Sequence, residues 1–175
     1  MTTWKIDNMH SQIGFKVKHL VVTNVSGIFG KFDATMEWSG KDLTDAKVNF
    51  SAQTDSISTG NEQRDGHLKT DDFFNSAKYP EIKFESKKVN KSDEHNYTLE
   101  GMLTIRDITK PITLNVVYGG TVKNAYNMTV AGFEISGKIN RRDFGLKWSA
   151  ATEAGHIVVS DEVRLDLTAE MIQQN

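Results

Sequence analysis

Hydrophobic and polar positions alternate along most of this chain with a period of two residues. The clearest run covers residues 28–38, where every even position holds an apolar residue or glycine. The odd positions of this run are polar, except for Phe29. Because successive side chains of a β-strand point to opposite faces, the run predicts a strand with one buried face.

Seven further segments show the same alternation and predict further strands: 13–17, 46–52, 82–86, 97–106, 112–118, 133–139 and 163–170. Around residues 128–133 the apolar parity slips from even to odd positions, which predicts a β-bulge. Clean alternation favours antiparallel strands with one solvated face. About eight such strands with little helix predict an all-β fold, either a closed up-and-down barrel or a sandwich, in one domain spanning residues 1–175.

One segment departs from this pattern. From about residue 61 to residue 77 the alternation stops, and Asn61 is a suitable N-cap for a helix. Residues that favour helix follow it: Glu62, Gln63, Leu68 and Lys69. Pro80 ends the segment before the next strand. The pattern predicts a short helical insertion near residues 61–77, placed over one end of the barrel.

Composition narrows the function classes. The chain has 175 residues, enough to bury a core, and a formal net charge of -2, which gives no overall attraction to nucleic acid. No stretch reaches the ~18 apolar residues of a membrane span. There is no cysteine, so disulfides and thiolate chemistry are excluded. Residues 1–7 do not resemble a signal peptide, so we expect a cytoplasmic protein. The sequence leaves a homodimer open.

Candidate chemistry is densest within the predicted insertion, where Arg64, Asp65 and His67 lie close together. An acid–base role would also need a nucleophile, and neither G-x-S-x-G nor H-E-x-x-H occurs, so we predict no catalytic residue. Two other interpretations stay open. In the first, Arg64 and Asp65 form a network that fixes the insertion to the barrel rim. In the second, Arg64 binds a diphosphate head group through two hydrogen bonds.

His19 continues the inward register of residues 13–17, so its imidazole is expected to point into the barrel. It either bonds to backbone or donates to a ligand head group. We predict no metal site, because the five histidines show no paired ligand spacing: His10, His19, His67, His95 and His156.

Several apolar residues fall in predicted connections rather than strands: Leu20, Val21, Val22, Leu68, Phe73 and Phe74. Connections normally run over the surface, so these residues either pack back as a plug or line an apolar entrance.

An ordered series of short motifs covers nearly the whole chain. The series is Trp4-x-Ile6-Asp7-x-x-His10-Ser11-x-Ile13-x-Phe15-x-Val17-x-His19, Ser56-Ile57-x-Thr59-Gly60, Arg64-Asp65-x-His67-Leu68, Asp72-Phe73-Phe74, Tyr79-Pro80-x-Ile82-x-Phe84-x-Ser86, Gly101-x-Leu103-Thr104-Ile105, Thr109-x-Pro111 and Arg142-x-Phe144-Gly145-Leu146. In this order it resembles the YceI-like family; Asp107 departs from it, standing where relatives often carry glycine. The resemblance implies a lipocalin-like antiparallel barrel that encloses a polyisoprenoid or another long-chain amphiphile. It also favours the interpretation in which the apolar connections line an entrance.

We therefore predict a protein that binds or carries such a lipid without changing it and without a cofactor, its partner being a small-molecule lipid. The predicted cavity residues are Phe15, Val17, Phe32, Ala34, Met36, Phe50, Phe84, Leu103, Leu114 and Val116. The entrance or lid comprises Leu20, Val21, Val22, Leu68, Phe73 and Phe74, and the head-group candidates are His19, Arg64 and His67. Two alternatives stay open: an enzyme that modifies an isoprenoid lipid at the His19/Arg64/His67 end, and a structural or stress-response protein whose barrel is solid.

Overall fold

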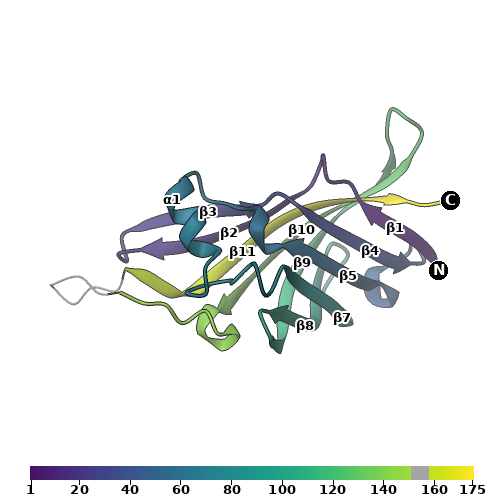
Figure 1. The fold of residues 1–175 in the computed structure, drawn as a ribbon. Coiled ribbons are helices and arrows are strands. Elements are labelled where there is room, and N and C mark those ends of the chain that lie inside the picture. Colours follow the sequence, from purple (N-terminus) through teal and green to yellow (C-terminus); the bar gives the residue numbers. More distant parts are fainter. Residues whose placement is uncertain (151–157) are drawn as a thin grey trace.

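The computed structural model describes residues 1–150 and 158–175, and within these residues one antiparallel sheet dominates (Figure 1). Its strands are β1 (Thr2–Ile6), β2 (Gln12–His19), β3 (Thr23–Phe29), β4 (Phe32–Trp38), β5 (Lys47–Gln53), β6 (Ile57–Ser58), β7 (Glu81–Lys91), β8 (Asn96–Ile105), β9 (Ile108–Lys123), β10 (Thr129–Asn140) and β11 (Val159–Gln173). The described helical elements are α1 (Glu62–Leu68) and three 3-10 turns: η1 (Leu43–Asp45), η2 (Thr54–Ser56) and η3 (Arg141–Phe144).

Eight of the strands form a closed barrel. Hydrogen bonding runs in the order β1-β4-β5-β7-β8-β9-β10-β11, and β11 pairs back with β1. Apart from the step from β1 to β4 and the short β6, neighbours in this circuit follow one another in the sequence. The predicted all-β barrel is thereby confirmed, and the sandwich is excluded.

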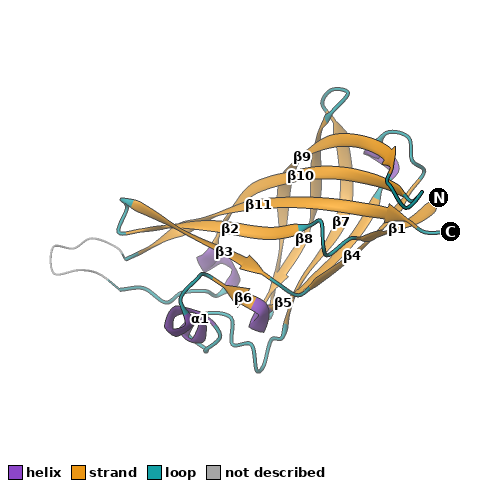
Figure 2. Cartoon of the chain, turned by 90° about the horizontal axis from the view of Figure 1, so that it is seen from above, coloured by secondary structure: helices purple, strands orange, loops and turns teal. Residues whose placement is uncertain are grey.

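The closing edge of β11 is shared between two strands. Near its end Met171 pairs with Ile6 of β1, whereas from Val159 to Thr168 its partner is β2. Between the two, the Asp7 amide donates to the Glu170 carbonyl at 2.8 Å. From this point β2 and β3 extend as a long hairpin beside one end of the barrel, as Figure 2 shows.

The single strand predicted over residues 28–38 is in fact two strands. β3 ends at Phe29 and β4 begins at Phe32, and the Gly30 amide between them donates to the Ser56 carbonyl at 3.1 Å. The break reverses the parity, so Phe29 is buried and Ile28 is exposed. The residue that interrupted the alternation is therefore the one that points inward.

Two local predictions are confirmed. The register between β9 and β10 shifts between Gly132 and Phe133, which is the predicted bulge. The helical insertion is present as α1 and the turns that follow it. Its N-cap is Asn61, whose side chain accepts a hydrogen bond from the Arg64 amide at 2.9 Å. In Figure 2 the insertion lies over the barrel end that also carries the β2–β3 hairpin.

The opposite barrel end is filled with aromatic side chains, here called the aromatic plug: Trp4, Trp38, Tyr118 and Phe133. The ring of Trp38 lies 5.1 Å from that of Trp4, 5.7 Å from that of Tyr118 and 6.2 Å from that of Phe133. Trp38 has no exposed surface and Trp4 has 2%. Such close packing leaves this half of the barrel solid.

Candidate ligand-binding site

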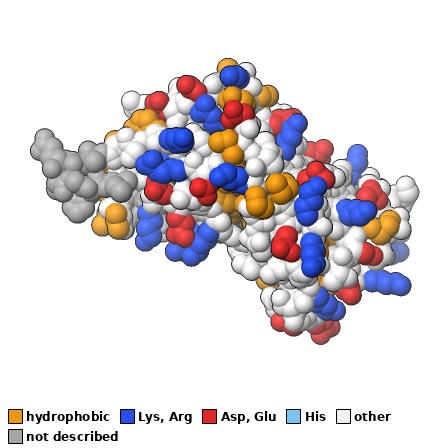
Figure 3. All heavy atoms as spheres, turned by 90° about the horizontal axis from the view of Figure 1, so that it is seen from below, with side chains coloured by type: hydrophobic (Ala, Val, Ile, Leu, Met, Phe, Trp, Pro, Cys, Tyr) orange, Lys and Arg blue, Asp and Glu red, His pale blue; other side chains and the backbone are white. Residues whose placement is uncertain are grey.

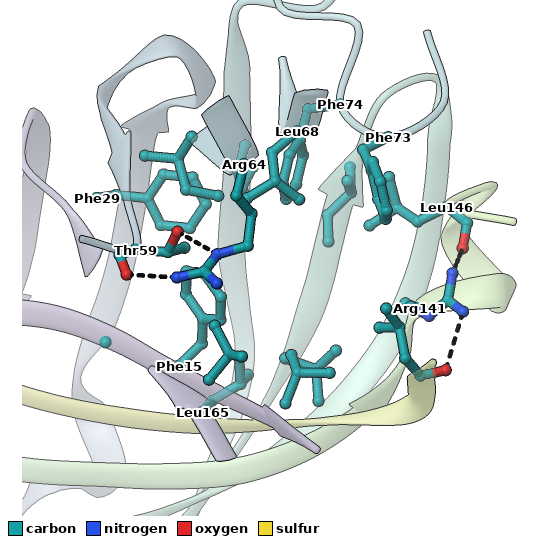
Figure 4. A pocket seen from close by; sticks show the side chains of 18 of the residues that line it. Phe15, Phe29, Thr59, Arg64, Leu68, Phe73, Phe74, Arg141, Leu146 and Leu165 are labelled. Atoms are coloured by element: carbon teal, nitrogen blue, oxygen red, sulfur yellow. Dashed lines mark hydrogen bonds between the residues drawn. The ribbon is translucent and has the colours of Figure 1, made fainter. Parts of the chain in front are cut away.

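A cavity of about 610 Å³ occupies the barrel end under α1. Its wall combines side chains from β2, β3, β5, β8 and β11 with residues of α1 and of the turns after α1 and η3. Most of the lining is apolar, and Figure 4 shows aromatic and aliphatic side chains converging on the space from several elements. Both the size and the lining are typical of small-molecule sites.

The ten predicted cavity residues divide between the two halves of the barrel. Four line the cavity: Phe15, Val17, Phe50 and Leu103. Five others are buried in the packed core without lining it: Ala34, Met36, Phe84, Leu114 and Val116. Phe32 is partly buried against that core. Alternation indicates that a side chain faces inward, but it does not indicate how deep along the barrel axis it lies.

The predicted entrance residues also divide. Leu68, Phe73 and Phe74 line the cavity from the insertion, and the Phe74 ring meets Phe29 edge-on at 5.8 Å. Leu20, Val21 and Val22 instead form the tip of the β2–β3 hairpin, where Leu20 is half-buried and the two valines are exposed, and none of them lines the cavity. Leu20 and Val21 have positive φ angles of 52° and 65°. Such angles are uncommon for non-glycine residues and most costly for a β-branched one.

The three head-group candidates, His19, Arg64 and His67, all line the same cavity. Arg64 donates to Thr59 twice, from Nε to the hydroxyl and from Nη2 to the carbonyl, each at 2.7 Å. Asp65 accepts from the same residue, from the amide at 2.9 Å and from the hydroxyl at 2.5 Å. The predicted Arg64–Asp65 network therefore exists, but it runs through Thr59, and no ion pair joins the two side chains.

His67 is held by its surroundings within the insertion. Its Nε2 lies 2.7 Å from Oδ2 of Asp72. Its ring meets Phe73 and Trp148 edge-on, with centroid distances of 5.2 and 5.1 Å. The imidazole thus ties the lid, formed by residues 61–77, to the segment that follows η3.

Arg141, on η3, is a cavity residue that the sequence pattern did not reveal. It is 3% exposed, and its guanidinium donates to backbone carbonyls, at 2.9 Å to Ser160, 2.7 Å to Leu146 and 2.6 Å to Trp148. Burial lowers the pKa of Arg141 below the ordinary value of an arginine, while the nearby Asp161 carboxylate partly offsets this by raising it. The group stays a cation at neutral pH. Its neighbour Arg142 belongs to one of the motifs that resemble the family, whereas Arg141 does not. Neither arginine lies in an alternating segment, so the sequence did not indicate that Arg141 is the buried one.

A second polar cluster lies outside the cavity, where β1, β2 and β11 meet. Ligand atoms of Asp7, His10 and Glu170 lie within 4.8 Å of one another. Nδ1 of His10 is 2.7 Å from Oδ2 of Asp7; this hydrogen bond raises the pKa of His10 and lowers the pKa of Asp7. Sequence spacing did not indicate Glu170. Of the other histidines, His156 falls outside the described residues.

No helix in residues 1–150 and 158–175 is both long enough and apolar enough to cross a membrane.

A closed antiparallel barrel of eight strands with an apolar cavity at one end belongs to the lipocalin-like class of barrels. The YceI-like domain model matches residues 4–171. A UPF0312 protein of Staphylococcus epidermidis is 36% identical over 176 residues, which cover 100% of both chains. The chain belongs to the YceI-like family.

Solved structures share the fold. A YceI protein of Campylobacter jejuni has a TM-score of 0.78 at 33% identity, over 97% of this chain and 96% of that one. A polyisoprenoid binding domain of Saccharophagus degradans, implicated in plant cell wall breakdown, has a TM-score of 0.71 at 16% identity, over 99% and 100% of the two chains. At this identity the second likeness concerns the fold alone.

Proposed function

We propose that the protein binds a polyisoprenoid or another long-chain amphiphile in the cavity under α1 and leaves it chemically unchanged. The observation that carries the proposal is the apolar cavity of about 610 Å³ inside a barrel of this family. The solved domain described as polyisoprenoid binding, which has the same fold, is consistent with it.

The energetics of apolar burial require a long chain. Each buried methylene contributes ~0.8 kcal/mol, and association costs ~4–15 kcal/mol before any affinity appears. A chain of about ten carbons thus offers ~8 kcal/mol, which barely offsets that cost. The ligand must therefore fill most of the cavity to bind well.

The arrangement of the polar lining supports binding over chemistry. The hydroxyl of Thr59 donates to Asp65 and accepts from Arg64, so it links the two side chains that hold the start of the lid. The imidazole of His67 is held within the lid by Asp72 and packs against Phe73 and Trp148, which is the arrangement of a structural contact. A lipid-modifying enzyme would need an activated nucleophile or water here.

The cavity also favours a carrier over a solid-barrel structural protein, since only the half around the aromatic plug is filled. A matched pair of alanines tests this. Ala52, 2% exposed, lines the cavity, whereas Ala34, 6% exposed, lies in the packed core. We expect Ala52→Phe to place its ring in the cavity and reduce lipid affinity by about tenfold or more while the fold persists. We expect Ala34→Phe to overpack the core and cost ~1–3 kcal/mol.

The measurements are a denaturant midpoint on delipidated protein, a titration with a fluorescent long-chain lipid, and native mass spectrometry of protein purified from several hosts. Wild-type protein that neither co-purifies with lipid nor binds any chain would overturn the proposal. A product formed from a prenyl diphosphate by wild type and lost in His67→Ala would replace it with the enzymatic alternative.

A further inference from the structure

The β2–β3 hairpin projects from the barrel end that carries the cavity. In Figures 1 and 2 its tip extends past α1. β3 pairs with β2 along its whole length, from Phe29 to Thr23, whereas its other edge pairs with β6 only at Ile28 and Phe29. The outer part of β3 is therefore a sheet edge that no other described strand covers.

Two exposed valines form the tip of this hairpin. Val21 is 63% exposed and Val22 is 80% exposed. The turn that carries them is ordered, because the Val22 amide donates to the His19 carbonyl at 3.2 Å and the Leu20 amide donates to the Val158 carbonyl at 3.0 Å. Single exposed apolar residues are common on protein surfaces, so exposure alone does not identify a partner.

The backbone of the turn supplies a second observation. Leu20 and Val21 both have positive φ angles, a combination for which asparagine and glycine are the ordinary residues. Elsewhere the chain follows that rule, with Asn75 and Asn127 at positive φ, and Arg106 is the one other described non-glycine residue of this kind. Val21 is thus an aliphatic, β-branched residue held at a strained position while its side chain stays exposed. Nothing within the described fold compensates for this strain, so an external partner is indicated.

The hairpin also differs from the rest of the protein in charge. Residues 12–29 contain the exposed Lys16 and Lys18 and no aspartate or glutamate, although the whole chain has 21 basic and 23 acidic residues. Neither lysine forms an ion pair within the described part of the chain. The face drawn in Figure 3 shows basic and acidic side chains interspersed. The excess of positive charge is therefore a property of the hairpin itself.

An apolar tip flanked by cations fits the surface of a membrane that contains anionic phospholipids. Such a surface offers negative head groups directly above an apolar layer, so one short element contacts both. A protein partner would require a broad face of about 800 Å², whereas this tip presents two apolar side chains. The hairpin is also part of the cavity wall, since Phe15, Val17 and Val25 line the cavity.

We propose that the β2–β3 hairpin docks the protein on membranes that carry anionic phospholipids. Val21 and Val22 insert at the boundary between head groups and acyl chains, and Lys16 and Lys18 bind the anionic head groups. Docking goes beyond the proposed function, because it does not require a filled cavity. If the cavity binds a long-chain lipid, docking brings the cavity end of the barrel to the surface in which such lipids reside.

The test is flotation of the purified protein with two kinds of vesicle, one of phosphatidylglycerol and phosphatidylcholine in equal parts and one of phosphatidylcholine alone. We expect the anionic vesicles to bind more protein, and the difference to shrink as salt is added. Lys16→Gln, at a position that does not line the cavity, should reduce the preference for anionic vesicles.

A double variant separates docking from a structural role of the turn. Val21→Gly with Val22→Ser removes both apolar side chains and places glycine at a positive φ. We expect this variant to be at least as stable as wild type, and to bind anionic vesicles about tenfold more weakly. Val122→Ser is the matched control, because Val122 is 64% exposed and lies near the β9–β10 turn at the opposite end of the barrel (Figure 1). It should bind as wild type does.

A fluorescent label locates the inserted residue directly. The chain has no cysteine, so Val22→Cys gives a single attachment site for a polarity-sensitive dye. We expect its emission to shift to shorter wavelengths on anionic vesicles. The same dye at Tyr126→Cys, in the exposed β9–β10 turn, should show no shift. This measurement decides the question if the double variant does not fold.

The outcomes separate docking from lipid binding in the cavity. Wild-type protein that floats with neither vesicle would refute docking. Binding that survives in the double variant, or that is lost equally in Val122→Ser, would refute the assignment to this hairpin, as would a dye at position 22 whose emission does not change. Equal binding to neutral and anionic vesicles would refute the role of the lysines. Protein that docks but takes up no long-chain lipid would instead refute the proposed function alone.

Discussion

At the scale of single residues, His10 and Asp7 form the contact where β1 gives way to β2. The pKa of His10 is raised above its usual 6.5, so its contribution to stability is present below pH 6.5 and is lost as pH rises through the raised value. The pKa of Asp7 is lowered from 3.8, so its contribution is present above pH 3.8 and is lost as pH falls through the lowered value. The contact therefore stabilises the fold most between these two limits.

We expect His10→Gln to destabilise the protein at about pH 5 and to do so progressively less toward about pH 9. Urea midpoints of wild type and variant across this range measure the effect. Asp7→Asn provides the control background, in which the same histidine substitution should show a weaker dependence on pH. A difference between wild type and variant that is constant across the range would contradict the assignment.

Arg141 and Arg142 are adjacent arginines in contrasting surroundings. Arg141 is buried and donates to three backbone carbonyls, whereas Arg142 is partly exposed and pairs with Asp161 at 2.7 Å. A buried carbonyl left unpaired costs ~1–3 kcal/mol, while exposed ion pairs contribute ~0–1 kcal/mol. The same substitution should therefore have very different effects at the two positions.

We expect Arg141→Met to lower the free energy of unfolding by about 3 kcal/mol or more, and Arg142→Met to lower it by less than about 1 kcal/mol. Chemical denaturation of both variants is the measurement. Equal losses in the two would mean that the carbonyls find other partners when Arg141 is removed.

At the scale of elements, α1 depends on Thr59 more than on its own length. A seven-residue helix is too short to be stable alone, and no α1 residue is fully buried. Thr59 compensates by bonding to Arg64 and Asp65 in successive positions. The lid is thus anchored from its N-terminal side.

We expect Thr59→Val to remove the hydroxyl that bridges these two side chains and to speed amide hydrogen exchange in α1 without affecting β9–β11. Thr104→Val is the control, because the hydroxyl of Thr104 bonds to Thr109 across the β8–β9 pair and makes no hydrogen bond to the described lid residues. Unchanged exchange in α1 would show that apolar contacts of Leu68 and Phe73 suffice to hold the lid.

Elements also show how far the sequence predicts this structure. Alternation identified the strands, the bulge at Gly132 and the insertion, because each depends on neighbouring residues. It missed β1, which is only five residues long, and it merged β3 with β4 across Gly30, because the parity there reverses through long-range pairing. At the site, the sequence indicated Arg64 and His67 because polar and charged residues lie close together there. It did not indicate Arg141, because only the folding of the chain brings that residue to the cavity.

At the scale of the whole molecule, the barrel is divided into a solid half and a hollow half. The solid half contains the aromatic plug and the closure by β1, and it requires no ligand for its packing. The hollow half combines the cavity, α1 and the β2–β3 hairpin. Stability and binding thus rest on different ends of one sheet.

This division predicts which backbone amides a bound ligand should protect from hydrogen exchange. We expect a saturating long-chain ligand to slow hydrogen exchange at α1 and at the start of β11, and to leave the amides beside Trp38 nearly unchanged, since those are already protected by packing. Exchange measured by mass spectrometry with and without lipid is the test. Uniform protection across all strands would indicate that the two halves are coupled.

The pairing of β1 with β11 also determines when the barrel can close during synthesis. During synthesis Ile6 leaves the ribosome long before its partner Met171 has been added to the chain. Until then β1 can pair with β4 but not with β11, so the barrel stays open. Contacts between residues so distant in sequence also form slowly. An open edge of this kind invites pairing with other chains. The barrel can therefore close only after Met171 has been synthesised, so any cargo enters a finished barrel past its lid and is not wrapped by a growing one.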